Sequence, residues 1–323
     1  MERRTLLQTA AVSLLSAPFV SRFARAAGKE MVYITPGLDL PFWRYLSRGI
    51  EATATKAGMT FTALDSHNNA QTQLSNAQDA ISRGVAGICI SPTDSSTAPS
   101  VLALASKAKI PVVVSDIGTN SGDYVSFVIS DNFEGAHAVG QALAAAMKAK
   151  GTTDGSVGII AISQARKNGQ ARTAGFRKAM AEAGITKEAG LQQMATYSTD
   201  ETFKFTQDML TANPGMRGLW IQTDQPTLGA LRALKTGRRD DVLVAAFDGT
   251  PELVELIKQG QVVGSGMQQP YLMGQKSAEA LLQHMDGKTP EKQIDVPILA
   301  VTAQNVAQML PTIKQTVFAG ELS

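Results

Sequence analysis

Two aspartates stand directly after apolar runs of the chain, where they are well placed to bind a polar molecule. Asp116 follows the run 111–115, and Asp248 follows the run 242–247. Ligands of parallel sheets sit at such strand ends. A carboxylate can accept hydrogen bonds from two adjacent hydroxyl groups, and the guanidinium of Arg172 can donate two at fixed geometry. These residue types favour recognition of a hydroxyl-rich small molecule.

Each of these side chains also has a simpler interpretation. Asp116 could cap a turn, and Asp248 could serve the turn that begins at Gly249. Arg172 could be a solvated charge on the outer face of a helix. Residue type and position alone leave both interpretations open.

The side chains that most often perform catalysis or bind metals are few and scattered. His67, His137 and His284 lie far apart in the sequence and form no metal-ligand pattern. The single Cys89 lies in an apolar run, which predicts a buried, unreactive thiol. The chain has no G-x-S-x-G nucleophile motif and no G-x-x-x-x-G-K-S/T phosphate loop. We therefore predict a protein that is not an enzyme and needs no metal or other cofactor.

The first 26 residues have the layout of a cleavable export signal. Arg3 and Arg4 precede a weakly apolar run over 9–20, and Ala-Arg-Ala at 24–26 is a small-x-small cleavage sequence. The paired arginines favour the twin-arginine route, with cleavage after residue 26 and residence in the periplasm. An ordinary secretory signal is the alternative. An uncleaved anchor is disfavoured, because the run is shorter than the roughly 20 residues that span a bilayer.

Removal of this signal changes the charge of the chain. It takes away four arginines and one glutamate, so the formal net charge falls from +2 to −1. The remaining chain has no basic excess that would attract nucleic acid or an anionic membrane. A DNA-binding regulator would need a basic helix-turn-helix ahead of its ligand-binding core. The export signal occupies that place, so a regulator is disfavoured.

Short apolar runs alternate with amphipathic stretches along the whole chain. The runs predict buried strands at 31–35, 59–64, 86–90, 111–115, 124–129, 156–162, 191–195, 217–221, 242–247 and 262–267. The amphipathic stretches predict helices at 42–57, 70–83, 132–150, 165–183, 201–212 and 225–236. This alternation predicts an α/β fold with parallel sheets covered by helices. Ten or more strands fit two sheets, and hence two lobes, better than one.

Three segments are candidate crossings between the lobes, and the first of them contains Ser130, Asp131 and Asn132. We expect these three residues to form a hinge and a helix cap rather than a ligand contact. The other crossings are expected near 267–270 and 295–299. The predicted organisation is a signal at 1–26, an N-terminal lobe at 27–130 plus 269–297, and a C-terminal lobe at 131–268 plus 298–323.

Several segments resemble the ribose-binding branch of the type I periplasmic binding proteins, in the same order and spacing. They are 64–69 (LDSHNN), 91–94 (SPTD), 110–116 (IPVVVSD), 130–132 (SDN), 172–176 (RTAGF), 223–224 (TD), 228–234 (LGALRAL) and 247–251 (FDGTP). The resemblance implies two similar α/β/α lobes joined by three hinge crossings, with a ligand held between them. It also implies a monomer that delivers this ligand to a membrane permease and ATPase complex of the ABC type.

The resemblance further implies a set of ligand-binding positions. Aromatic side chains would form the walls and pack on the C–H faces of a sugar, while acidic, basic and amide side chains would bind its hydroxyl groups. The expected ligand-binding residues are Phe42, Trp43, Asp116, Arg172, Tyr197, Thr223, Asp248 and Gln268. As an alternative, Phe42 and Trp43 could be core residues at the start of a helix.

Two positions depart from the ribose-binding pattern. Ile117 stands where the relatives usually have arginine, and Leu40 stands where they commonly have asparagine. The N-terminal side of the pocket would thereby lose a cation and an amide. We therefore expect a sugar or polyol other than ribose, with a deoxy sugar or a small non-sugar ligand as alternatives. A periplasmic sensor subunit for a membrane kinase uses the same fold and is the alternative to the importer role.

Overall fold

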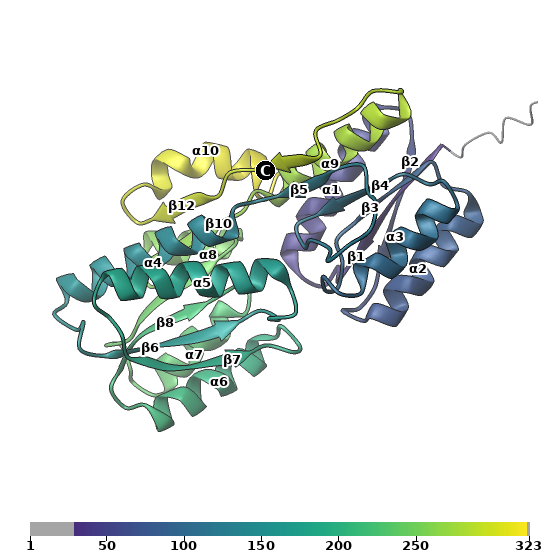
Figure 1. Cartoon of the computed structure of the whole chain (residues 1–323). Helices are drawn as coiled ribbons and strands as arrows, with labels where there is room; N and C mark the ends of the chain where they lie inside the picture. Colours follow the sequence, from purple (N-terminus) through teal and green to yellow (C-terminus); the bar gives the residue numbers. More distant parts are fainter. Residues whose placement is uncertain (1–28, 322–323) are drawn as a thin grey trace, which may run out of the picture.

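The computed structural model describes residues 29–321 and contains two α/β lobes, each built around its own sheet (Figure 1). The expected export signal lies outside the described residues. We call the body formed by the earlier sheet the first lobe and the other body the second lobe. The prediction of two α/β lobes built on parallel sheets is confirmed.

The sheet of the first lobe has the strand order β11-β5-β4-β3-β1-β2, and all its strand pairs are parallel. Its strands are β1 (Glu30–Thr35), β2 (Thr60–Asp65), β3 (Gly87–Ile90), β4 (Val112–Ser115), β5 (Phe127–Ile129) and β11 (Gln293–Asp295). Four helices belong to this lobe: α1 (Pro41–Lys56), α2 (Ala70–Arg83), α3 (Ala98–Lys107) and α9 (Pro270–Met285).

The sheet of the second lobe has the order β12-β10-β9-β8-β6-β7, and β12 alone runs antiparallel to its neighbour β10. Its strands are β6 (Ser156–Ala161), β7 (Glu188–Gln193), β8 (Met216–Ile221), β9 (Leu243–Phe247), β10 (Gly264–Met267) and β12 (Leu299–Thr302). Its helices are α4 (Asn132–Ala149), α5 (Lys167–Glu182), α6 (Thr199–Ala212), α7 (Thr227–Thr236), α8 (Pro251–Lys258) and α10 (Val306–Thr316).

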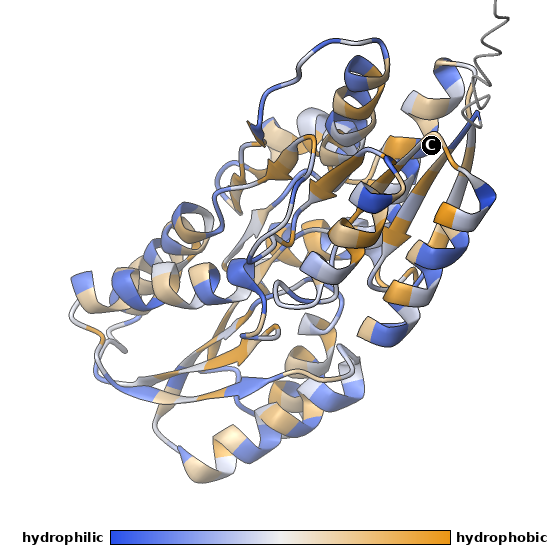
Figure 2. Cartoon of the chain, turned by 45° about the vertical axis from the view of Figure 1, so that its right-hand side comes forward, coloured by the Kyte–Doolittle hydropathy of each residue, from blue (hydrophilic) through white to orange (hydrophobic). Residues whose placement is uncertain are grey.

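Most strands overlap a predicted apolar run, but several elements were not predicted. β7 begins at Glu188, three residues before the expected run at 191–195. The helices α3, α8, α9 and α10 and the edge strands β11 and β12 had no counterpart in the predicted list. Figure 2 shows why the central strands were easier to predict, because they are mostly hydrophobic whereas the helices carry both kinds of residue.

Helices approach one another closely where glycine removes a side chain. A Cβ atom on Gly49 of α1 would lie 2.1 Å from the carbonyl oxygen of Tyr271 in α9, and one on Gly274 would meet α1 equally closely. In the second lobe, a Cβ on Gly175 of α5 would lie 2.1 Å from the carbonyl oxygen of Phe133 in α4. These contacts dock α9 on the first lobe and α4 on the second.

The chain passes between the two sheets three times. The connecting segments are 130–131 between β5 and α4, 268–269 between β10 and α9, and 296–298 between β11 and β12. The carboxyl ends of the parallel strands of both sheets face the space between the lobes, so the loops after these strands can carry a shared site. No helix within 29–321 combines the length and hydrophobicity needed to cross a bilayer.

Candidate functional site

The two lobes present aspartates at matching positions after their strands. Asp116 follows β4, and its backbone N–H donates to Val128 O of β5 at 2.8 Å; Asp248 follows β9, and its N–H donates to Gly266 O of β10 at 3.0 Å. Both residues have φ = 62°, a left-handed backbone that is uncommon for a residue with a side chain. The turn thereby places each carboxylate at the end of its strand, which is the position expected from the sequence.

These carboxylates line a small cavity between the lobes, which we call the inner chamber. Its volume is about 30 Å³. Seven of the eight expected ligand-binding residues line it, and the eighth, Gln268, donates through Nε2 to Asp248 Oδ1 at 2.9 Å. The complete lining is Leu40, Phe42, Trp43, Asp116, Ile162, Arg166, Asn168, Arg172, Tyr197, Thr223, Asp224 and Asp248. The structure therefore brings the expected residues together, while their role in binding stays a prediction.

Arg172 of α5 is fixed by several neighbours in the second lobe. It is 2% exposed, so it is not the solvated charge that the sequence left as an alternative. Its Nη1 donates to Gln222 O at 2.6 Å and to Asp248 Oδ2 at 3.3 Å, and its Nε donates to Asn132 Oδ1 at 2.7 Å. The guanidinium also lies 4.0 Å from the ring centre of Phe247.

Buried acceptor atoms without a donor gather at the same place. Among the described residues, four buried side-chain polar atoms have no hydrogen-bond partner, and three of them are Asp116 Oδ1, Asp224 Oδ2 and Gln268 Oε1. The other oxygens of the two aspartates are bound: Asn168 Nδ2 donates to Asp116 Oδ2 at 2.9 Å, and Gln225 N donates to Asp224 Oδ1 at 2.6 Å. Leaving such atoms unpaired is costly, so the arrangement suits a ligand that donates hydrogen bonds.

The carboxylates of the inner chamber also have shifted pKa values. Burial raises the pKa of Asp116 to about 6, although the positive charge of Arg172 opposes this rise. Burial likewise raises the pKa of Asp224 and of Asp248, and the negative charge of Asp248 adds to the rise at Asp224. Hydroxyl donors from a ligand would favour the charged forms and reverse part of these shifts.

The aromatic residues serve both the core and the chamber. Phe42 and Trp43 lie in the first turn of α1 as an edge-to-face pair with ring centres 4.8 Å apart. Both also pack in the first-lobe core with Ile117. Ile117 is fully buried there and is not among the residues that line the chamber. Tyr197 faces the chamber from the second lobe, and its hydroxyl accepts from Ser163 N at 3.2 Å.

The expected hinge residues take three different roles. Asp131 caps α4, because its side chain accepts from Glu134 N at 3.0 Å. Asn132 is buried and positions Arg172 through its Oδ1, while its Nδ2 donates to Ser130 O at 2.9 Å. Ser130 is buried in the crossing between β5 and α4.

Three polar residues that line the inner chamber are absent from the expected ligand-binding set. Asp224 lies three residues after the end of β8, whereas Asp116 and Asp248 directly follow their strands; an acidic residue in the loop after an apolar run is a signal that could have identified it. Arg166 is the N-cap of α5 and Asn168 is its second residue; both fall in the helix predicted at 165–183, whose pattern does not indicate contacts with the other lobe.

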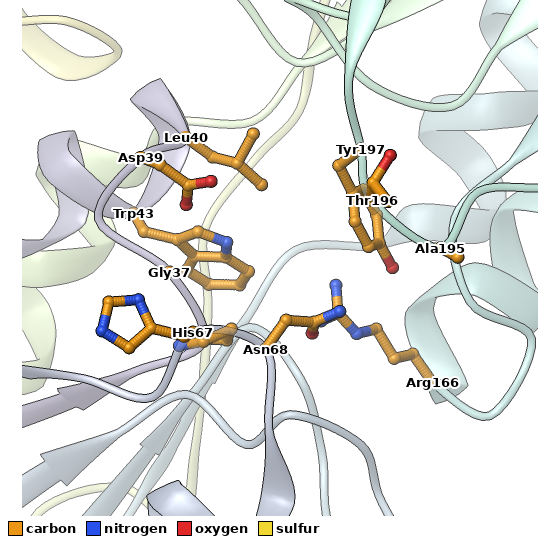
Figure 3. A pocket seen from close by; sticks show the side chains of 11 residues that line it. Gly37, Asp39, Leu40, Trp43, His67, Asn68, Arg166, Ala195, Thr196 and Tyr197 are labelled. Carbon is orange, nitrogen blue, oxygen red and sulfur yellow. The ribbon is translucent and has the colours of Figure 1, made fainter. Parts of the chain in front are cut away.

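A larger cavity, which we call the outer chamber, adjoins the inner one. Its volume is about 340 Å³, and it shares Leu40, Trp43, Arg166 and Tyr197 with the inner chamber. Figure 3 shows Trp43 and Leu40 on one side, Tyr197 on the other, and the side chains of Asn68 and Arg166 meeting between them. The remaining lining residues are Pro36, Gly37, Asp39, His67, Ala195 and Thr196.

Comparison with known proteins gives a consistent result for most of the chain. Residues 31–289 match the model of the periplasmic binding protein domain. A ribose import binding protein from Salmonella typhimurium is 32% identical over 282 residues, covering 87% of this chain and 93% of the relative. A D-apiose import binding protein from Paraburkholderia graminis is 28% identical over 280 residues, covering 85% and 88%.

A solved structure extends the comparison to the fold. A carbohydrate transporter solute-binding protein from Agrobacterium radiobacter, in complex with D-arabinose, superposes with a TM-score of 0.82 at 24% identity, covering 90% of this chain and 99% of that one. With the two-lobed fold, the site between the lobes and the matching family model, the resemblance inferred from the sequence is confirmed: this chain belongs to the periplasmic binding protein family, in its ribose-binding branch.

Proposed function

We propose that this chain is the ligand-capturing subunit of an ABC-type sugar importer and that it binds one small sugar or polyol between its lobes. The observation that carries the proposal is the group of buried acceptors, on Asp116, Asp224 and Gln268, that have no donor within the described residues. A polyhydroxy ligand supplies several donors at once, and Arg172 and the aromatic walls complete such a site. Relatives named for the import of ribose and of apiose support the same class of ligand.

Closure of the two lobes would couple binding to transport. Asp116 belongs to the first sheet, whereas Asp224 and Asp248 follow strands of the second. A ligand that contacts both groups has a higher affinity for the closed form than for the open one, so it shifts the population toward closure. The closed, loaded protein would then dock on a membrane permease and ATPase complex, leaving the ligand chemically unchanged.

The proposal includes lobe boundaries and location. We assign 27–130 plus 269–297 to the first lobe and 131–268 plus 298–323 to the second, with Ser130, Asp131 and Asn132 at one hinge. The division of the strands between two sheets supports this assignment. We further propose a monomer that is exported to the periplasm, as its family resemblance implies.

A ligand screen tests the proposed function. The chain from residue 27 would be heated with D-ribose, D-apiose, D-allose, D-arabinose, myo-inositol or glycerol, because a ligand that binds the folded state raises the melting temperature. At least one sugar or polyol should do so, and calorimetry should show an affinity loss of about ten- to a hundred-fold in Asp116→Ala. If none of these compounds shifts the melting temperature, or if Asp116→Ala binds normally, the proposed function or its site is wrong.

A further inference from the structure

Three consecutive residues at the start of α5 reach across the space between the lobes. Arg166, Lys167 and Asn168 belong to the second lobe, yet they make five hydrogen bonds to loops of the first. Lys167 N donates to Ser95 Oγ at 3.3 Å, and its Nζ donates to Thr119 O at 2.9 Å. The first turn of α5 thus forms a clasp over the strand ends of the other lobe.

Arg166 occupies the centre of this clasp, between the two chambers. Its Nε donates to Thr93 O at 2.9 Å and its Nη2 donates to Asn68 Oδ1 at 2.8 Å, while the guanidinium carbon lies 5.3 Å from the ring centre of Tyr197. Although Arg166 is a long charged side chain that lines the outer chamber, it is only 4% exposed. Figure 3 shows Arg166 and Asn68 end to end between the walls formed by Trp43 and Tyr197.

The two residues that flank the Arg166 side chain in space, Asn68 and Tyr197, have an uncommon backbone conformation. Asn68 has φ = 52° and Tyr197 has φ = 56°, both in the left-handed region. For a bulky residue such as tyrosine this conformation persists only where the surroundings fix it, and such residues cluster at ligand clamps. The backbone conformation of Asn68 and Tyr197 therefore fixes where their side chains meet Arg166.

We propose that Arg166 is a specificity-determining gate: once the inner chamber, about 30 Å³ in this form, has widened around a bound sugar or polyol, Arg166 separates it from the outer chamber, so that the site retains a small unsubstituted ligand and rejects derivatives with a substituent facing the gate. The inference rests on the proposed function and names the size class of its ligand. A substituent that extends into the outer chamber has to displace Arg166 from Thr93 and Asn68. Displacement leaves a buried guanidinium and its acceptors unpaired, which is a penalty against the larger ligand.

Binding kinetics test the gate. Arg166→Ala and Asn68→Gly remove the two ends of one hydrogen bond, and glycine keeps the left-handed backbone at residue 68. For the tightest binder among D-ribose, D-apiose, D-allose and D-arabinose, Arg166→Ala should raise the dissociation rate about ten- to a hundred-fold. The association rate should change by less than about threefold, because the gate acts on the closed form. Arg238→Ala, at an exposed arginine of the same lobe, is the matched control and should change neither rate.

Selectivity provides the second measurement. Mono-O-methyl derivatives of the same sugar place one methyl group at each position in turn, so one of them faces the gate. In Arg166→Ala the affinity of at least one derivative, relative to its parent sugar, should rise about tenfold or more over the wild-type ratio. If Arg166→Ala weakens the parent sugar but leaves every ratio unchanged, Arg166 is a ligand contact and not a gate.

A ligand-independent measurement separates failure of the gate from failure of the proposed function. Of the two tryptophans, Trp43 lines both chambers and is 5% exposed, whereas Trp220 is fully buried in the second lobe. Quenching by acrylamide should therefore increase in Arg166→Ala and stay unchanged in Arg238→Ala. Equal quenching of the wild type and Arg166→Ala would overturn the gate. Absence of binding by all four sugars would instead refute the proposed ligand class, whatever the quenching result.

Discussion

Replacement of Arg172 by alanine should destabilise the protein because it leaves Asp248 as an unpaired buried charge. Arg172 supplies the cation of the buried ion pair with Asp248, whose atoms are 3.3 Å apart and whose side chains are 3% and 6% exposed. Removing one partner of such a pair typically costs about 3–5 kcal/mol. The hydrogen bonds to Gln222 O and Asn132 Oδ1 are lost as well. We therefore expect a decrease of about 3–5 kcal/mol in the free energy of unfolding at pH 7.

Urea unfolding followed by circular dichroism measures this decrease, and a double variant identifies its cause. Adding Asp248→Asn to Arg172→Ala removes the unpaired charge, so the double variant should be more stable than Arg172→Ala by about 1–3 kcal/mol. Arg172→Lys keeps a charge without the planar fork and should lie between wild type and Arg172→Ala. If the double variant is no more stable than Arg172→Ala, the buried charge of Asp248 is not the source of the effect and the reasoning is wrong.

Three further predictions address pH, packing and export. The pKa of Asp116 is about 6 in the folded state against an ordinary 3.8. Because the folded state holds the proton more tightly than the unfolded state, this group stabilises the fold below about pH 4, and the stabilisation is lost as the pH rises through about 6. In urea unfolding, Asp116→Asn should therefore match wild type near pH 4 and exceed it by up to about 3 kcal/mol above pH 6; a pH-independent difference would contradict the assignment. Gly175→Ala should lower the melting temperature, because its Cβ would lie 2.1 Å from a carbonyl oxygen of α4, whereas Gly215→Ala has open space and should be neutral. Replacement of both Arg3 and Arg4 by lysine should leave precursor in the cytoplasm in a fractionation experiment, and normal periplasmic accumulation would exclude the twin-arginine route.

The central strands and the polar residues at their ends could be predicted from the sequence because their signals are local. The strand Val112–Ser115 is buried on both faces, and three of its four residues are valine, which makes it recognisable as an apolar run. The edge strands β11 and β12 are short and partly exposed, so they lack that signal. α9 packs on the backbone of α1 at Gly274, a contact between segments distant in the chain that no local pattern indicates.

Site residues could be predicted where the local sequence around them carries a signal. Asp116 and Asp248 follow apolar runs, and the aromatic positions came from the family resemblance rather than from any periodic pattern. Arg166 and Asn168 could not be found in this way, because their partners lie in loops of the other lobe. The position of Ile117 also shows this limit: the residue beside Asp116 packs into the core on the far side of the turn.

The late position of α9 and β11 in the chain affects how the protein is synthesised. α1 approaches α9 at Gly49 and Gly274, and β5 gains its outer neighbour only from β11, which ends at Asp295. Domains generally fold as units while they leave the ribosome. Here the first lobe to be translated stays unfinished until about nine-tenths of the chain has been made, well after the central strands of the second lobe have emerged. During that interval α1 can pack on β1 and β2 but lacks α9, so the part of its surface that α9 covers stays exposed in the growing chain.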